Sequence, residues 1–167
     1  LQTAWSAIED GGYTRELLHQ DKTKEDLGGK VGVFVGVMYE EYQLFGAEQT
    51  LMGNPTGLLN SPSSIANRVS YFFDFHGPSL AIDTMCSSSI TAIHLACESL
   101  KSGESNYAIA GGVNVSIHPN KYRILSNGKF ISAKGKCESF GEGGEGYIPG
   151  EGVGAVLLRP LSKAKAD

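Results

Sequence analysis

Cys86 is the residue of this sequence best placed to do chemistry. It follows residues 79–84, which predict a short buried strand, and it precedes residues 88–96, which predict a helix. A cysteine at the start of a helix lies beside N–H groups without partners inside the helix, at the positive end of its dipole. This environment favours the thiolate, and the same N–H groups can stabilise an oxyanion. The turn could therefore supply a nucleophile and part of its transition-state stabilisation.

The residues after Cys86 predict a helix that is apolar on nearly all sides and therefore buried. Small serines precede it as candidate caps, and Gly103 follows it as a stop. The apolar positions at helical spacing are Ile90, Ala92, Ile93, Leu95, Ala96, Cys97 and Leu100. The alternative for Cys86 is an inert, buried thiol, which is the usual role of a free cysteine.

Residues 83–89, Asp-Thr-Met-Cys-Ser-Ser-Ser, resemble the nucleophile motif of the β-ketoacyl synthases, the condensing enzymes of fatty-acid and polyketide assembly. In that family the cysteine accepts an acyl chain from a carrier-protein thioester. Other segments resemble the family in the same order along essentially the whole chain. They are Ser-Ile-Ala-Asn-Arg-Val-Ser-Tyr at 64–71, Gly-Pro-Ser at 77–79, Ala-Ile-Ala-Gly-Gly-Val-Asn at 108–114, and Gly-Tyr-Ile-Pro-Gly-Glu-Gly-Val-Gly at 146–154.

The alternation of strands and helices predicts an α/β domain. The resemblance implies the N-terminal half of a thiolase-like fold, a layered α/β structure in which the nucleophile helix is buried between sheets. It also implies that residues 1–167 are the N-terminal portion of a β-ketoacyl synthase domain, a fragment without the C-terminal half. Family members form dimers through the strand before the nucleophile, which here is residues 80–84.

The resemblance implies a reaction in two stages, with Cys86 as the catalytic residue. Cys86 takes the acyl chain, and a malonyl-type extender on acyl carrier protein then loses carbon dioxide and attacks the acyl group. The family uses histidines from His-Gly-Thr and Asn-Ile-Gly-His motifs, which this sequence lacks. We therefore expect the chain alone to be inactive in condensation. No histidine here is assigned to catalysis; they are His19, His76, His94 (predicted to be packed in the core) and His118.

Departures from the commonest family pattern point to a subtype. Met85 replaces a small alanine beside the nucleophile, where a flexible side chain would reshape the acyl pocket or fill a gap. Residues 140–142 and Pro149 also differ from the frequent pattern. Together with residues 114–122, they resemble ketosynthases of modular polyketide synthases whose acyltransferase is a separate protein.

Composition limits the partners and the compartment. A net charge of −4 gives no basic footprint for nucleic acid, and no apolar stretch is long enough for a membrane span. The three cysteines, Cys86, Cys97 and Cys137, have no metal-ligand spacing, and their odd number fits the reducing cytoplasm. The resemblance implies acyl carrier protein and neighbouring synthase domains as partners. No cofactor is expected to bind directly, because substrates are carried on the phosphopantetheine of the carrier protein.

The rest of the chain is interpreted mainly as scaffold. We expect a helix at residues 1–12 with Trp5 as a core anchor, and a polar surface connection at 14–29. Further predicted elements are a buried strand at 31–37 with close packing at Gly32 and Gly36, a loop at 55–64, a helix to residue 73 capped by Ser63 or Ser64, a strand at 107–115, a short helix at 120–125, and a strand at 153–158.

Several polar or aromatic clusters are given their ordinary interpretations. Residues 39–42, two glutamates between tyrosines, predict a solvated turn rather than a site, and the aromatics at 71–73 and 75 predict core packing. Gly150 and Gly152 predict close backbone packing near the Cys86 turn, because no helix follows them to make a phosphate site. Solubility is preferred to carrier-protein docking for four basic residues, Lys121, Lys129, Lys134 and Lys136.

Three other functions remain open. A non-elongating homologue would keep the fold but lack a working histidine, and a non-catalytic scaffold would contain an inert Cys86. A cysteine hydrolase would place glycines two residues on either side of its nucleophile. Those positions are Thr84 and Ser88, so the hydrolase loses support.

Overall fold

The computed structural model describes residues 1–22, 24 and 27–167, which divide into two compact units. The first unit comprises Leu1–Met38, Ser61–Val113 and Val153–Asp167. The second comprises Tyr39–Asn60 and Asn114–Gly152. Part of the predicted surface connection at 14–29 lies outside the described residues. No helix in the described ranges is long and apolar enough to cross a membrane.

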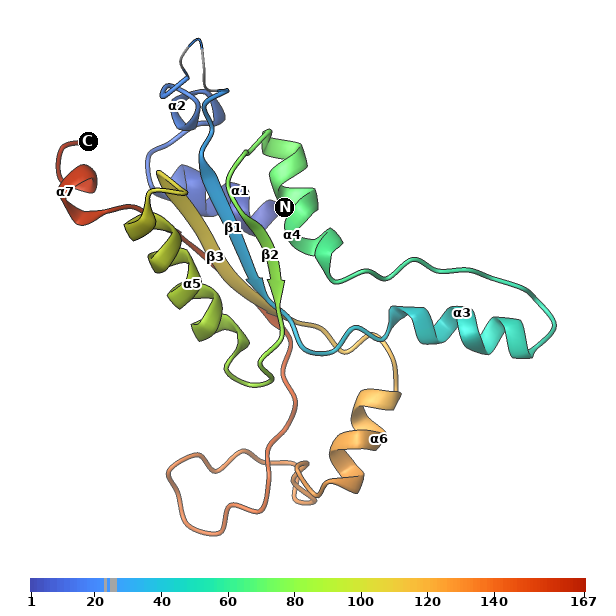
Figure 1. The fold of residues 1–167 in the computed structure, drawn as a ribbon. Helices are drawn as coiled ribbons and strands as arrows, with labels where there is room; N and C mark the ends of the chain where they lie inside the picture. Colours follow the sequence, from blue (N-terminus) through green and yellow to red (C-terminus); the bar gives the residue numbers. More distant parts are fainter. Residues whose placement is uncertain (23, 25–26) are drawn as a thin grey trace. The chain divides into compact units, whose positions relative to one another are not determined.

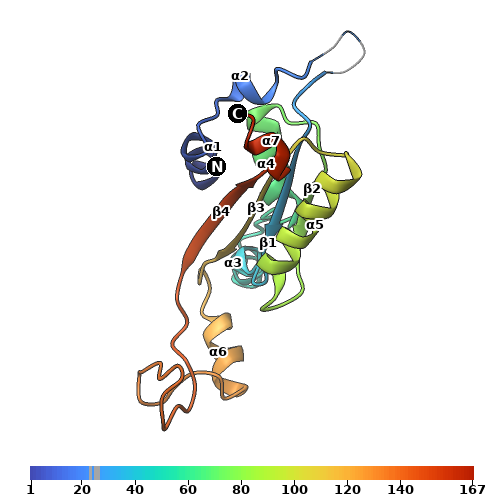
Figure 2. The same ribbon diagram turned by 90° about the vertical axis from the view of Figure 1, so that its left-hand side faces the viewer.

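A mixed four-stranded sheet forms the centre of the first unit (Figure 1). Its strands lie in the order β2 (Ser79–Ile82), β1 (Val31–Gly36), β3 (Tyr107–Asn114) and β4 (Gly152–Leu158). The central strand β1 pairs in parallel with both neighbours, so that Val33 lies opposite Ser79 on one side and Ile109 on the other. β4 returns along β3 in the opposite direction (Figure 2).

Helices cover both faces of this sheet. Side chains alternate between the faces of a strand, and β1 follows this period. Val31 and Val33 are fully buried in a cluster with α1 (Gln2–Asp10) and α4 (Ser63–Phe73), whereas Phe34 is buried with residues of α5 (Ser88–Ser102). The layers are therefore helices, sheet and helix, which confirms the predicted layered α/β class.

The nucleophile helix α5 is covered on its sheet side. Ala92 and Ala96 are fully buried, while Ile90 is 68% exposed and His94 is also exposed. The predicted core position of His94 is wrong for this chain, because the described residues supply only one sheet against α5. The predicted end of the helix is confirmed, since Gly103 caps it with a left-handed backbone at φ 79°.

Sequence patterns located the main elements of the first unit and missed its short ones. α1, β1, α4, β3 and β4 lie close to their predicted ranges. α2 (Arg15–Leu18) and α7 (Leu161–Ala164) were not predicted, and Leu18 is fully buried within the expected surface connection. The predicted serine cap of α4 is also wrong, because Pro62 occupies the N-cap position without a side-chain bond.

The second unit contains two helices, α3 (Tyr42–Leu51) and α6 (Asn120–Asn127). The predicted helix at 120–125 corresponds to α6, whereas α3 was not predicted. The interpretation of residues 39–42 as a solvated turn is wrong at Glu41, which is only 8% exposed. Its carboxylate accepts bonds from Asn120 Nδ2 at 2.8 Å and from the Lys121 N–H at 3.2 Å.

Lys121 is buried as well, so it does not serve the surface solubility predicted for it. Its Nζ donates to Asn114 Oδ1 at 2.6 Å and lies 4.9 Å from the centre of the Tyr39 ring. Burial lowers the pKa of the Lys121 ammonium, and the charges of Glu151 and Glu41 oppose this shift. These contacts, with Glu41 as the acidic partner, define what we call the Lys121 cluster.

Candidate active site

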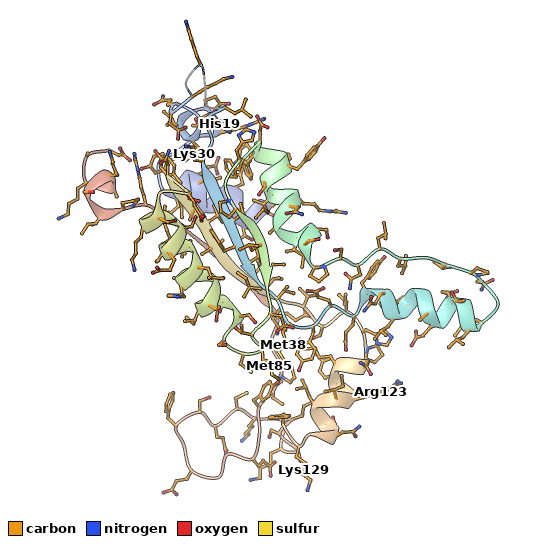
Figure 3. The ribbon with its side chains drawn as sticks, viewed as in Figure 1. His19, Lys30, Met38, Met85, Arg123 and Lys129 are labelled. Atoms are coloured by element: carbon orange, nitrogen blue, oxygen red, sulfur yellow. The ribbon has the colours of Figure 1, made fainter. Side chains whose placement is uncertain are left out.

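Cys86 lies in the loop between β2 and α5, one residue before Ser87, which is the N-cap of α5. The helix begins at Ser88, as predicted, whereas the strand ends at Ile82, two residues before its predicted end. The Cys86 side chain is exposed to solvent. Figure 3 shows the adjacent Met85 in this loop. The predicted order of strand, cysteine and helix is therefore confirmed, but the predicted burial of the strand is wrong, because Leu80 is 44% exposed and Ile82 is the one buried residue of β2.

The backbone directly before Cys86 has an uncommon conformation. Met85 has a φ of 59°, in the left-handed region that residues other than glycine seldom occupy. Its N–H donates to Asp83 Oδ1 at 2.8 Å, which is the bond of an Asx turn. Thr84 and Cys86, on either side of Met85, are assigned an isolated β-bridge. This tight turn presents the thiol beside the helix terminus.

Hydroxyl groups from the first turn of α5 hold the loop. Ser88 Oγ accepts from the Thr84 N–H at 2.9 Å and donates to Met85 O at 2.6 Å. Ser87 Oγ donates to Thr84 O at 2.8 Å, and Thr91 Oγ1 lies 3.0 Å from Thr84 Oγ1. The predicted serine capping is wrong, because Ser87 makes no side-chain cap bond. The initial N–H groups of α5 therefore carry no side-chain cap.

Ser87 and Ser88 were predicted only as helix caps, and the bonds by which they and Thr91 hold the turn were not predicted. The bonded residues are close in sequence: Asp83 is two residues before Met85, and Thr84 is four residues before Ser88. A local sequence pattern could therefore have predicted these bonds. An aspartate two residues before a sharp turn is typical of an Asx turn. The hydroxyls could be expected to bond nearby backbone groups, which Ser and Thr side chains commonly do.

Glycines let the start of α5 approach the sheet closely. A Cβ on Gly36 would lie 2.6 Å from backbone atoms of Ser88 and Ser89, and one on Gly112 would lie 2.8 Å from Ser89 Cβ. The predicted close approach at Gly36 is therefore confirmed, and Gly32 is similarly confined beside Phe34. The Cys86 turn thus directly precedes a helix terminus that is fixed against two strands, as precise site geometry requires.

The glycines at 150 and 152 do not pack as predicted. Gly150 and Gly152 have open space where a Cβ would project, so the close packing predicted for them is wrong. Within the described part of the first unit, no side chain is hydrogen-bonded to the Cys86 thiol. The described residues also contain no group of three or more His, Cys, Asp or Glu side chains that could hold a metal ion.

Residues 1–164 match the family described as "Beta-ketoacyl synthase, N-terminal domain". The chain therefore belongs to the β-ketoacyl synthase family, a family of condensing acyltransferases. It is 67% identical over its whole length to the polyketide synthase PksL of Bacillus subtilis and 58% identical to the polyketide synthase ThaG of Burkholderia thailandensis. It spans only 4% and 3% of these two proteins.

Solved ketosynthase structures share the fold. The oxazolomycin ketosynthase domain OzmH KS7 of Streptomyces albus matches 99% of this chain with a TM-score of 0.89 and 54% identity. The ketosynthase from module 6 of the bacillaene synthase of Bacillus subtilis matches 99% with a TM-score of 0.82 and 35% identity. The chain covers 28% and 26% of those structures. The predicted thiolase-like fold is confirmed by these matches.

Proposed function

We propose that Cys86 is the acyl-accepting nucleophile of a polyketide synthase ketosynthase. The intact enzyme would catalyse decarboxylative Claisen condensation with a malonyl-type extender on acyl carrier protein. One observation carries the proposal: Cys86 has an exposed side chain, directly precedes the N-cap of α5 and directly follows a left-handed residue. Membership of the condensing family supports it.

Acylation would proceed by attack of the Cys86 thiolate on the carbonyl carbon of the incoming thioester. A new C–S bond forms, the old C–S bond breaks, and the departing pantetheine thiolate takes a proton from solvent. The Ser88 N–H donates to Met85 O at 3.1 Å, and the next N–H groups of α5, which have no side-chain cap, are suited to stabilise the tetrahedral oxyanion. The thiol of Cys86 needs no bound cofactor for this step, because phosphopantetheine of the carrier protein delivers the acyl group.

Condensation would then release Cys86. Loss of carbon dioxide from the malonyl-type unit gives a carbanion, which attacks the acyl carbon and expels Cys86 as the thiolate. The family histidines that stabilise the enolate have no counterpart in this sequence, so the chain alone is expected to lack condensing activity. We accordingly treat residues 1–167 as a partial β-ketoacyl synthase domain.

Met85 is proposed to contribute to the acyl pocket. Its side chain is 64% exposed and directly precedes the nucleophile in sequence. A flexible thioether adapts to different acyl shapes, whereas the alternative role is to fill a gap. The resemblance at residues 114–122 supports the subtype whose acyltransferase is a separate protein.

Partners follow from the same proposal. Acyl carrier protein and neighbouring synthase domains would exchange substrates with Cys86 in the cytoplasm. A homodimer through residues 80–84 is supported by the place of β2 at the edge of the described sheet, where Leu80 is 44% exposed. An edge strand offers unpaired backbone groups to a second strand.

Protection from alkylation tests the nucleophile. Incubation with an acyl thioester should block later alkylation of Cys86 by iodoacetamide, while Cys137, which is also exposed, remains reactive as an internal control. The non-elongating alternative predicts the same protection, but no condensation product with malonyl carrier protein. The scaffold alternative predicts equal alkylation of Cys86 with and without thioester.

A further inference from the structure

Ser88, the first residue of α5, is a buried serine at the end of an exposed turn. It is 5% exposed, whereas residues 83–87 before it are all exposed. Its carbonyl carbon lies 2.6 Å from where a Cβ on Gly36 would stand, so β1 fixes the position of its backbone. At the other end of the turn, the Val37 N–H donates to the Ile82 carbonyl at 3.0 Å. The turn is therefore held at both ends by β1 and the residue that follows it.

The Ser88 hydroxyl uses its donor and its acceptor capacity on this turn. Its Oγ accepts from the Thr84 N–H at 2.9 Å and donates to Met85 O at 2.6 Å. A hydroxyl has one proton to donate, and Met85 O receives it. The Ser88 N–H donates to the same carbonyl oxygen at 3.1 Å. Ser88 therefore holds two peptide groups of the turn, the one before Thr84 and the one before Cys86.

These two peptide groups enclose the left-handed residue Met85. A backbone conformation of this kind, with a φ of 59°, persists where the surrounding contacts determine it. The peptide between Met85 and Cys86 is trans, and its atoms lie close to one plane. Met85 O and the Cys86 Cα both belong to that plane. The bonds that hold the oxygen therefore also hold the atom to which the Cys86 side chain is attached.

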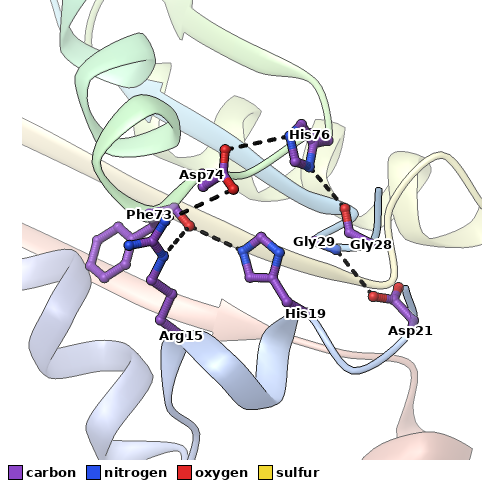
Figure 4. Close-up of polar contacts among 8 residues, drawn as sticks. All are labelled: Arg15, His19, Asp21, Gly28, Gly29, Phe73, Asp74 and His76. Atoms are coloured by element: carbon purple, nitrogen blue, oxygen red, sulfur yellow. Dashed lines mark hydrogen bonds and ion pairs between the residues drawn. The ribbon is translucent and has the colours of Figure 1, made fainter. Parts of the chain in front are cut away.

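Asp74, another left-handed residue of the first unit, with a φ of 61°, offers a comparison (Figure 4). The carbonyl before it, that of Phe73, accepts from Arg15 Nε at 3.1 Å and lies 3.1 Å from His19 Nε2. These side chains bind the C-terminal end of α4, and none of them belongs to the Cys86 turn. Side chains thus bind the backbone at both of these left-handed residues, but only Met85 directly precedes the proposed nucleophile.

We propose that Ser88 is a positioning residue for Cys86, an inference that rests on the proposed function of Cys86 as the acyl acceptor. The bonds of the Ser88 hydroxyl keep Met85 left-handed and so hold the thiol in position to attack a carbonyl carbon. The rate of such an attack depends strongly on the distance and angle between the reacting atoms. Alkylation by iodoacetamide, a small reagent that needs no fixed binding place, depends less on the position of the thiol. Loss of the hydroxyl should therefore slow acylation more than alkylation.

The test compares two rate constants of Cys86 in the protein extended through the C-terminal half of the ketosynthase: acylation by an acyl thioester and alkylation by iodoacetamide. Ser88→Ala should lower the acylation rate about tenfold or more and change the alkylation rate by less than about twofold. Ser88→Thr keeps the hydroxyl and should retain acylation within about threefold of the parent. Equal acylation of the parent and Ser88→Ala, or acylation and alkylation rates that fall by the same factor, would overturn the proposal.

Two control variants separate positioning from a general loss of stability. Ser99 is also 5% exposed and also lies on α5, where its Oγ is 2.8 Å from Ser105 Oγ. Ser99→Ala and Arg15→Ala each remove a side-chain bond away from the turn. Both should lower the melting temperature but leave the acylation rate of Cys86 within about twofold of the parent. A loss of acylation as large as that of Ser88→Ala in either control would contradict the proposal, because acylation would then follow stability.

Amide hydrogen exchange decides the matter even if Ser88→Ala fails to fold. The Thr84 N–H of the parent donates to Ser88 Oγ, so it should exchange about tenfold or more slowly than an unprotected amide. Exchange at the unprotected rate would overturn the proposal. A parent that forms no acyl adduct would contradict the proposed function itself, whereas an acylated parent with an equally reactive Ser88→Ala variant would contradict the role of Ser88 alone.

Discussion

The Cys86 turn and the Lys121 cluster both contain polar groups held by hydrogen bonds. They differ in solvent exposure, because the Cys86 thiol is exposed whereas Lys121 and Glu41 are buried. At the turn, the thiol is exposed, and the supporting hydrogen bonds come from serine and threonine hydroxyls and from the exposed carboxylate of Asp83. In the cluster, Lys121 and Glu41 are both buried; the Lys121 ammonium donates to Asn114 Oδ1, and the Glu41 carboxylate accepts from the Lys121 backbone N–H. The first arrangement keeps a group available for reaction, whereas the second uses charges to organise structure.

The two units differ in how much apolar core they contain, and this explains why buried charges occur in the second unit. The first unit has apolar clusters on both faces of its sheet, so its turn rests on a packed scaffold. Among the described residues of the second unit, Leu125 is the only buried hydrophobic residue, beside the buried polar side chains Glu41, His118, Lys121 and Ser132. Satisfied polar contacts therefore carry a larger share of the order in that unit.

The largest expected effect on the free energy of unfolding comes from a substitution at the contact between β1 and α5. Gly36→Val should destabilise the fold by about 3 kcal/mol, because its Cβ would overlap backbone atoms of Ser88 and Ser89 that lie 2.6 Å away. It should also slow acylation of Cys86, since the helix start must move. Chemical denaturation and the rate of acyl-adduct formation measure the two effects.

Gly154→Ala is the matched control on another strand, because a Cβ at Gly154 would meet nothing within 4 Å. It should change the free energy of unfolding by no more than about 0.5 kcal/mol. Equal destabilisation by the two substitutions would mean that the close approach at Gly36 is unimportant.

The Lys121 cluster should be the next most sensitive region. Lys121→Ala should cost about 2 kcal/mol, because it leaves Asn114 Oδ1 without its 2.6 Å donor and opens space beside Tyr39. Lys136→Ala, at an exposed lysine, should change the free energy of unfolding by less than about 0.5 kcal/mol. Similar values for both lysines in urea denaturation would remove the distinction drawn between buried and surface charges.

The left-handed residue before Cys86 should have a smaller effect. Met85→Val should destabilise by about 1 kcal/mol, because a branched side chain is disfavoured at a φ of 59°. Met85→Gly relieves that conformation but adds freedom to the unfolded chain, so its net effect should stay below about 1 kcal/mol. Thermal denaturation of both variants should rank Val as the less stable; the reverse order would argue against a strained turn.

The smallest effect is a pH dependence of the Lys121 cluster. Burial lowers the pKa of Lys121 in the folded protein below its ordinary 10.5, so the unfolded chain holds more protons between the two values. The cost of burying the charge is present below the folded pKa and is relieved as pH rises toward 10.5. The stability of the parent relative to Lys121→Met should therefore increase as the pH rises toward 10.5. A flat difference would mean that the ammonium is not desolvated.

Local patterns predicted the strand–turn–helix at Cys86 because periodicity, small residues and Gly103 act over short distances. They failed at Glu41 and Lys121, whose partners are brought together across 80 residues. Trp5 illustrates another limit: a helical pattern places it on the apolar side of α1, but whether a neighbour covers its outer surface depends on tertiary packing. The local structure of the turn could therefore be predicted, whereas the buried charges and the exposure of Trp5 could not.

Mass spectrometry of the intact protein tests the central claim most directly. The version extended through the C-terminal half of the ketosynthase is incubated with an acyl thioester, beside its Cys86→Ala variant. We predict an acyl adduct on the parent and none on the variant, with both proteins folded by circular dichroism. An adduct that persists in Cys86→Ala, or none on a folded parent, would contradict the assignment of Cys86 as the nucleophile.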